Sequence, residues 1–265
     1  MPAAIHLIQA DTPARDDLAS LLAARGAAVT LSQPGADPVV PNCDAAVFLC
    51  DEDPLVAGGV PATGVAAGWA KGAAEVDARF VLCSSVLLYA DGGEAELMAN
   101  DPELGDMPEL EPLRQAELEL FGSSAEVMLL RLGIVVGSQG SAVADLVERV
   151  KSGNLPVPAG RQHFVPLLDR ATLADALVEV AASKLHGGWD LVADDAPLGE
   201  LVEFVAAEVG GPTPVTVPLD EAIAAAGVEA ATRWLTSRKV TGRNLRETGA
   251  VEARPWRDIV SEAIA

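Results

Sequence analysis

The chain has 265 residues, with 39 acidic and 18 basic side chains and a formal net charge of −21 at pH 7. Half of the residues are hydrophobic and 22% are charged, so the chain can bury a core and is not disordered throughout. The acidic excess disfavours nucleic acid and anionic membranes as partners, because binding to phosphate groups depends on Lys and Arg. No apolar stretch reaches the roughly 20 residues that a bilayer span needs.

Targeting signals and metal-binding patterns are absent from the sequence. The start, MPAAIHLIQADTPARDD, shows no basic region followed by an apolar core, which predicts a cytoplasmic protein. Cys43, Cys50 and Cys83 have no CxxC spacing and lie in or beside apolar runs, so we expect reduced, buried thiols. The acidic residues of segment 91–111 are irregularly spaced, which favours a solvated loop over a cation site. We therefore expect no metal.

Short apolar runs alternate with helical patterns along most of the chain. The predicted strands are 4–8, 27–31, 45–50, 79–83, 127–132 and 189–193, and the predicted helices are 16–25, 65–76, 110–121, 142–151 and 173–184. For the last of these helices we expect Thr172 as the N-cap and Gly187 just past the other end. The alternation predicts an α/β protein with a parallel sheet and helices on its faces.

Beyond Pro212 the chain becomes richer in turns. Helical patterns remain at 220–226 and 256–264, and a short strand-like piece lies at 214–217. We expect one domain at 1–211, which includes the strand at 189–193. A smaller C-terminal lobe at 212–265 would be interleaved with the late part of that domain.

Five segments occur in a characteristic order: IHLIQA with a helix and ARGAAVTLS, then CDAAVFLC, RFVLCSSVLLYA, LLRLGIVVG and a helix beginning TLADAL. In this the chain resembles the extended short-chain dehydrogenase/reductase superfamily, which includes NAD-dependent epimerases and dehydratases and the NmrA-like proteins. GGWDLVADDAPLGELVEFVAAEVG and LRETGAVEARPWRDIVSEAI resemble the family's late strand and helix and its C-terminal helix pair. The resemblance implies a Rossmann-like doubly wound sheet with a ligand crevice at the carboxyl ends of its strands.

The family's cofactor positions are changed in this chain. Family members place GxxGxxG after the first strand, so that pyrophosphate can approach a helix N-terminus, whereas here Gln9, Thr12 and Arg15 occupy the glycine positions. Ser32 stands where the family has an acid or a base for the ribose, and segment 32–43 is too short for the family's next strand and helix. We expect no dinucleotide in the usual pose and leave NAD or NADP open in an altered one.

The family's catalytic YxxxK motif would fall near residues 105–120, where this chain has neither Tyr nor Lys. Its absence removes the phenol that exchanges a proton with substrate and the ammonium that lowers the pKa of that phenol. Ser85 falls where the family keeps a Ser that hydrogen-bonds the substrate oxygen, with Ser84 one residue earlier. Tyr89, the only tyrosine, completes this group as a candidate donor, with packing in a turn as the alternative.

Arg161 and His163 lie where family members direct an Arg toward an anionic substrate, and His163 would titrate near neutral pH. The alternative is a surface basic pair near Asp169. Arg131 at a strand end is more typical of a structural ion pair. Ser85, His163 and Asp169 could form a hydrolase triad, but the GxSxG signature of such enzymes is missing.

The combined losses favour an atypical, non-redox protein, in effect a pseudoenzyme that binds a ligand in a regulatory role or supports a protein partner. One alternative is an NAD(P)-dependent epimerase or reductase with altered cofactor binding. Another is a cofactor-independent isomerase, cyclase or lyase that uses Ser85, Tyr89 and His163, so the question of catalysis stays open. Expected partners are a small molecule in the crevice or a protein, and the resemblance suggests a homodimer through the helices at 65–76 and 110–121.

Overall fold

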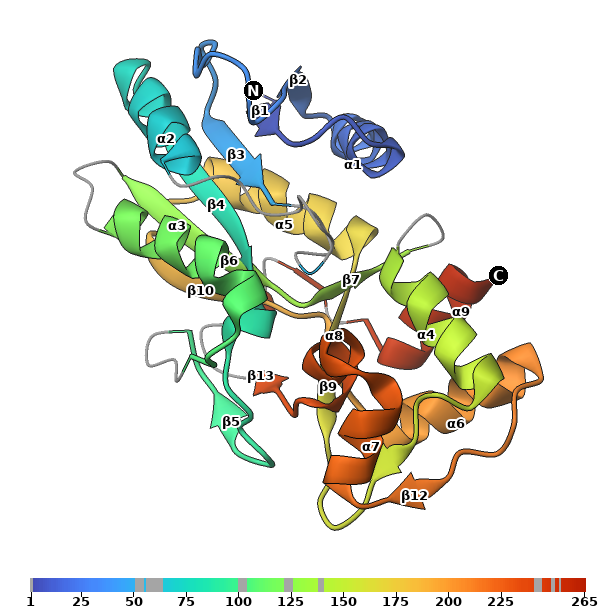
Figure 1. The fold of residues 1–265 in the computed structure, drawn as a ribbon. Helices are drawn as coiled ribbons and strands as arrows, with labels where there is room; N and C mark the ends of the chain where they lie inside the picture. Colours follow the sequence, from blue (N-terminus) through green and yellow to red (C-terminus); the bar gives the residue numbers. More distant parts are fainter. Residues whose placement is uncertain are drawn as a thin grey trace.

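The computed structural model describes residues 2–50, 55, 64–99, 104–121, 126–137, 141–240, 245–248, 251–252 and 254–265. Its centre is a six-stranded sheet in the order β10-β6-β4-β3-β1-β2, in which every neighbouring pair is parallel (Figure 1). The strands are β1 (Ala4–Ile8), β2 (Ala28–Ser32), β3 (Ala45–Leu49), β4 (Arg79–Ser85), β6 (Val127–Leu132) and β10 (Gly187–Leu191). The predicted α/β class with a parallel sheet is confirmed.

Helices cover both faces of this sheet, which is why its strands read as continuous apolar runs. α1 (Pro13–Ala24) and α5 (Arg170–Ala182) pack together against β1 and β2 on one face. α2 (Val65–Glu75) and α3 (Glu111–Phe121) pack on the other face, against β3, β4 and β6. All five residues of β3 are buried between the two layers. The arrangement is the doubly wound, Rossmann-like architecture that the sequence predicted.

The start of α5 differs from the prediction. The helix begins at Arg170, and its N-cap is Asp169, whose Oδ1 accepts the Thr172 N–H at 2.9 Å. The Thr172 hydroxyl donates to the other oxygen of Asp169 at 2.6 Å, so Thr172 lies inside the first turn. Asp caps as well as Thr, and it comes three residues earlier. Gly187 is not next to the helix end either; it is the first residue of β10, with φ at +77°.

β2 is the outer edge of the sheet, because segment 33–44 forms neither strand nor helix. That segment crosses α2 instead: the Trp69 indole donates to the Pro34 carbonyl at 3.1 Å, and Gly72 lies so close to the Pro38 carbonyl that a Cβ would collide with it. In the sheet, β1 lies between β2 and β3. The point where the strand order reverses lies between β1 and β3.

The other elements gather beyond the carboxyl ends of β4, β6 and β10 (Figure 1). β9 (Phe164–Asp169) lies between β7 (Ile134–Val136) and β11 (Asp194–Pro197) in a three-stranded sheet. Two-residue strands form two further pairs, β5 (Glu96–Leu97) with β13 (Lys239–Val240), and β8 (Val157–Pro158) with β12 (Thr216–Val217). The helices here are α4 (Ser141–Ser152), α6 (Leu198–Val209), α7 (Leu219–Ala226), α8 (Val228–Ala230) and α9 (Trp256–Ile264).

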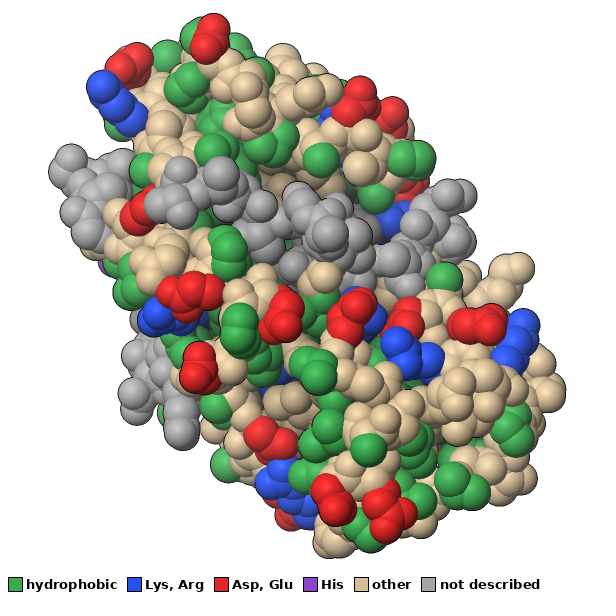
Figure 2. All heavy atoms as spheres, in the orientation of Figure 1, with side chains coloured by type: hydrophobic (Ala, Val, Ile, Leu, Met, Phe, Trp, Pro, Cys, Tyr) green, Lys and Arg blue, Asp and Glu red, His purple; other side chains and the backbone are tan. Residues whose placement is uncertain are grey.

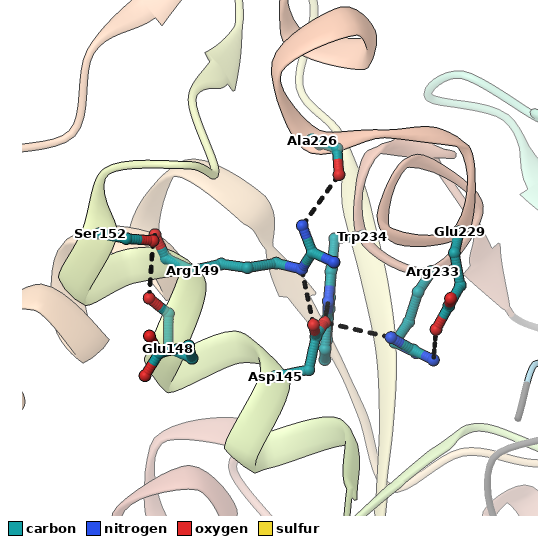
Figure 3. Close-up of polar contacts among 8 residues, drawn as sticks. All are labelled: Asp145, Glu148, Arg149, Ser152, Ala226, Glu229, Arg233 and Trp234. Carbon is teal, nitrogen blue, oxygen red and sulfur yellow. Dashed lines mark hydrogen bonds and ion pairs between the residues drawn. The ribbon is translucent and has the colours of Figure 1, made fainter.

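One carboxylate joins α4 to the segment that follows α7 (Figure 3). Asp145 accepts from Arg149 Nε at 2.6 Å, from Trp234 Nε1 at 2.8 Å and from Arg233 Nη1 at 3.1 Å. Arg149 also donates to the carbonyl of Ala226 at 2.8 Å. Since Ala226 is the last residue of α7, this bond fixes the end of α7 to α4. We call these five residues the Asp145 junction. The junction holds α7 and the segment that follows it against α4.

Acidic side chains are scattered over the whole visible face rather than gathered into one patch (Figure 2). Some of the chain's acidic groups form ion pairs with basic groups, as in Glu200 with Arg257 at 2.8 Å and Glu96 with Lys239 at 3.3 Å. Within the described ranges, no helix has the length and apolar content to cross a bilayer.

Candidate functional site

The three altered glycine positions form the turn from β1 into α1. Thr12 is the N-cap of α1 and accepts the Arg15 N–H on its hydroxyl at 3.3 Å, while Pro13 at the next position has no N–H to offer. The Arg15 guanidinium lies against two carboxylates, at 2.5 Å from Asp11 and 3.0 Å from Asp16. The helix end that binds pyrophosphate in a glycine-rich turn is here capped by its own side chains.

Gln9 and Ser32 meet at the carboxyl ends of β1 and β2. The Gln9 N–H donates to the Ser32 carbonyl at 3.1 Å, which extends the strand pairing by one residue. Gln9 is 2% exposed, and its side-chain Oε1 has no hydrogen-bond partner among the residues that the structure describes. Buried polar groups are nearly always hydrogen-bonded, so this orphaned amide at the reversal point of the sheet needs an explanation.

These residues do not fit a dinucleotide in the family's usual pose. That pose requires free backbone N–H groups and open space at the helix end. Here a buried side chain takes the Gln9 position, the Thr12 cap satisfies one of the N–H groups, and Arg15 with its two carboxylates fills the third position. A pyrophosphate would also face the negative charge of Asp11 and Asp16.

The two serines that follow Cys83 are both committed to contacts inside the protein. Ser84 donates to Glu117 of α3 at 2.5 Å, and both side chains are buried. Ser85 accepts the Leu87 N–H at 3.1 Å and so caps the 3₁₀ turn η1 (Val86–Leu88). In this geometry the Ser85 hydroxyl serves as a cap at the end of β4.

Tyr89 lies inside the protein, with no exposed surface. Its phenol donates to Asp190 Oδ1 at 2.6 Å and accepts from Arg131 Nη1 at 3.2 Å. Burial raises the pKa of Tyr89 far above its usual value, and the neighbouring Asp190 charge raises it further. Burial also raises the pKa of Asp190 to about 7, although Tyr89 and Arg131 act in the opposite direction.

Arg131 holds this cluster together. Its Nη2 and Nε donate to the two carboxylate oxygens of Glu117 at 2.7 and 3.0 Å, so the predicted structural ion pair is present. Burial lowers the pKa of Arg131, but the hydrogen bonds and charge of Glu117 outweigh it and leave the pKa raised. The buried polar chain, as we name it, runs through Ser84, Glu117, Arg131, Tyr89 and Asp190.

The helix that would carry the YxxxK motif is α3. Its buried side consists of Leu113, Ala116, Glu117 and Leu120. The position one turn before Glu117 is thus apolar, and no phenol or ammonium projects from this helix toward the serines of β4. The absence of both groups, which the sequence predicts, leaves this face of α3 with one carboxylate that is already paired.

Arg161 and His163 belong to a different neighbourhood. Arg161 pairs with Asp91 at 2.5 Å, and His163 Nδ1 contacts the Leu235 carbonyl at 2.8 Å. Burial lowers the pKa of His163, an effect that the Leu235 carbonyl opposes. Both residues line a hollow of about 270 Å³ beside the start of α6. No hydrogen bond within the described chain links Ser85, Tyr89 and His163 to one another.

The proposed triad is not assembled, because Asp169 serves elsewhere. It caps α5 and pairs with Arg254 at 3.0 Å, while Ser85 and His163 have the separate partners given above. The described residues also contain no group of three or more His, Cys, Asp or Glu side chains that could hold a metal ion. Part of the acidic segment, residues 100–103, lies outside the described residues.

Sequence reasoning missed Glu117, Asp190 and Arg238. Arg238 is fully buried and donates to the carbonyls of Leu87 and Tyr89, both at 3.1 Å, which fixes the turn that carries Tyr89. The available signal was a charged residue within an apolar segment, as Asp190 is within GGWDLVA. Such residues are buried only with partners.

Comparison of the sequence with family models gives no match, and comparison with curated proteins gives none either. Solved structures do match over nearly the whole chain. The human epimerase family protein SDR39U1 with NADPH has a TM-score of 0.71 at 22% identity and covers 98% of both chains.

Two bacterial structures are similar to the same extent. Bordetella bronchiseptica WbmG with NAD has a TM-score of 0.70 at 14% identity, over 100% of this chain and 93% of that one. The dTDP-4-dehydrorhamnose reductase of Bacillus anthracis with NADP has a TM-score of 0.73 at 12% identity, over 100% and 99%. The chain therefore has the Rossmann-like fold of the extended short-chain dehydrogenase/reductase and epimerase proteins.

Proposed function

We propose that this protein binds a small polar molecule at the carboxyl ends of β1 and β3 and performs no hydride transfer. The observation that carries the proposal is the buried Gln9 amide, whose Oε1 has no partner. It stands at the point where the strand order reverses, which is where open α/β sheets bind ligands.

An orphaned buried acceptor raises the free energy of the ligand-free protein by about 1 to 3 kcal/mol. A ligand that donates an N–H or O–H to Gln9 removes that cost, so the site favours a donor-bearing ligand over a carboxylate or phosphate. The carboxylates of Asp11 and Asp16 beside the same turn favour the same choice, because they repel anions.

The other half of the proposal rests on how the candidate catalytic groups are used. The Tyr89 phenol, which could move a proton, lies wholly inside the buried polar chain, and the Ser84 hydroxyl is bonded to Glu117. A general acid must reach the substrate atom that it protonates. The buried polar chain stabilises the fold and supplies no such group to the crevice.

The test compares wild type with Gln9→Leu, which removes the acceptor at nearly constant volume. The probe is the fraction below about 1 kDa of a heat-treated extract of the expression host, followed by thermal shift and native mass spectrometry. We expect this fraction to raise the melting temperature of wild type and not that of Gln9→Leu. Asp190→Asn, which alters an orphaned group on β10 at the other edge of the sheet, is the matched control, and the extract should raise its melting temperature as much as that of wild type.

Either an equal response of Gln9→Leu and wild type, or no response of wild type, would contradict the proposal. A second candidate function is NAD(P) binding in an altered pose, which the ligands of the similar structures favour, since these contain NADPH, NAD and NADP. It predicts stabilisation by a purified dinucleotide alone, without any other component of the extract.

A further inference from the structure

We propose that two copies of this chain pair through β2, edge against edge and antiparallel, so that two sheets become one continuous sheet. The proposal is independent of the ligand at Gln9. It follows from the hydrogen-bonding groups, the charge and the symmetry of the free edge.

The free edge of β2 is defined by its bonds to β1. The Ala28 N–H donates to the Ala3 carbonyl at 2.8 Å, and the Ser32 carbonyl accepts from the Gln9 N–H at 3.1 Å. Backbone groups of alternate residues in a strand point to opposite sides, so Ala28, Thr30 and Ser32 direct theirs toward β1. The N–H and C=O groups of Val29 and Leu31 therefore point away from the sheet, and no described residue bonds to them.

This edge lacks the usual protection. Natural edge strands are blocked by charged side chains, Pro, bulges or a covering element. β2 reads AVTLS, without charge, Pro or Gly, and Leu31 is 42% exposed. β2 lies at the rim of the molecule in Figure 1, with segment 33–44 crossing α2 instead of covering it.

Charge indicates which partner covers the edge. Segment 26–36 contains none of the chain's 39 acidic or 18 basic residues, whereas acidic side chains are scattered over the face shown in Figure 2. Two copies that each carry −21 repel each other least where such a neutral segment meets its equal. A basic partner would instead be attracted to the acidic surface, so the neutral edge fits a second copy of this chain.

Symmetry fixes the register. With the two-fold axis at Thr30, Val29 of one copy faces Leu31 of the other, and each such pair exchanges two hydrogen bonds. This register uses every outward group of both strands, whereas an axis at Val29 or Leu31 would leave half of them unpaired. It also places Val29 and Leu31 side chains in apolar cross-strand contact. Thr30, whose hydroxyl contacts His6 Nδ1 at 2.8 Å, then stands opposite Thr30 of the partner subunit.

The register gives a crosslinking test. The two Thr30 residues form a non-hydrogen-bonded pair, with Cα atoms about 4.5 Å apart, which is within the range of a disulfide. In a Cys43→Ser background, Thr30→Cys should yield a disulfide-linked dimer under mild oxidation. Ser32→Cys is the matched control, because residue 32 faces Ala28 of the partner subunit in this register. It should crosslink at about one tenth of the rate of Thr30→Cys or more slowly still.

Leu31→Pro tests the backbone bonds. It removes an outward N–H that the monomer does not use, so the β1–β2 bonds and the melting temperature should be retained. The crosslinking rate of Thr30→Cys should then fall about tenfold. Raising the salt concentration should increase dimer formation in wild type by screening the −21 charge.

Equal crosslinking of Thr30→Cys and Ser32→Cys would overturn the proposed register. Absence of any crosslinked dimer, or a Leu31→Pro variant that crosslinks as fast as its parent, would overturn β2 pairing itself. A dimer through α2 and α3 alone would give no Thr30→Cys crosslink, because those helices lie on a face of the sheet and not at its β2 edge.

Discussion

The phenol of Tyr89 donates a 2.6 Å hydrogen bond to Asp190, whose other carboxyl oxygen has no partner in the described part of the chain. Both side chains are completely buried, and the Arg131 guanidinium lies 5.2 Å from the centre of the Tyr89 ring. A tyrosine held in this way is part of the packed interior and has no exposed surface. The relationship also places an ionisable carboxyl group where its charge is poorly solvated.

Asp190 should make stability depend on pH. Its pKa of about 7 in the folded protein exceeds the ordinary value of 3.8, so the folded state binds this proton more tightly than the unfolded chain does. The resulting stabilisation is complete below about pH 4 and is lost as the pH rises through about 7. Asp190→Asn keeps an acceptor for Tyr89 without the charge. Relative to wild type, it should gain about 2 kcal/mol or more of unfolding free energy between pH 4 and pH 8.

Urea unfolding of both proteins at a series of pH values measures this difference. Comparing the variant with wild type cancels the pH dependence of the other carboxylates, which are numerous in this chain. A difference that stays constant between pH 4 and pH 8 would show that Asp190 is not the titrating group.

Glu117 and Arg131 should behave as a buried ion pair. Glu117→Ala leaves the Arg131 charge without compensation and should cost about 3 to 5 kcal/mol of unfolding free energy. The double variant Glu117→Leu with Arg131→Met removes both charges and should recover most of that loss. The matched control is Glu111→Ala on the same helix, which breaks an exposed pair with Arg114 and should cost much less.

Chemical denaturation of wild type, Glu117→Leu, Arg131→Met and the double variant gives the coupling between the two positions, and Glu117→Ala and Glu111→Ala are measured beside them. If Glu117→Ala were as mild as Glu111→Ala, the pair would not be buried in the way described. A double variant as unstable as Glu117→Ala would mean that the loss comes from packing and not from charge.

The strands of the central sheet were predictable because each is an apolar run with helices on both sides. β1, β3 and β6 begin where the sequence places them. β9 was missed because FVPLLD contains Pro166, which normally argues against a strand with neighbours on both sides. The two-residue strand β12 lies within the strand-like piece expected at 214–217. The other two-residue strands depend on distant partners, as β5 does on β13, and no local pattern reveals them.

The candidate site was predictable where it depended on residue identity alone. The missing Tyr and Lys of α3 and the altered turn at Gln9 are visible in the sequence. The partner of Tyr89 was not, because Asp190 lies 101 residues away and reaches it only through the order β4-β6-β10. The expected roles of Ser85 and His163 came from resemblance, which does not reveal that each already has a partner.

The Asp145 junction should contribute strongly to the stability of α7 and the segment that follows it. Asp145→Ala removes the acceptor for Arg149, Arg233 and Trp234 and should cost about 2 to 4 kcal/mol of unfolding free energy. Glu148→Ala is the matched control, since Glu148 lies on the same helix but its exposed side chain points away from the junction (Figure 3).

Limited proteolysis locates the effect. Asp145→Ala should become sensitive to cleavage within 219–235, whereas Glu148→Ala should be cleaved as wild type is. If the two variants were equally sensitive to the protease, Asp145 would not be the connection between α4 and the segment 219–235.

The proposed function requires that this Rossmann-like fold works without a nicotinamide cofactor. The most direct test is native mass spectrometry of the freshly purified protein, followed by thermal-shift titration with NAD⁺, NADH, NADP⁺ and NADPH. We predict no retained dinucleotide and no rise in melting temperature, because only a ligand that prefers the folded state stabilises it. A retained dinucleotide, or a melting temperature that rises at micromolar concentrations of one of the four, would contradict the claim.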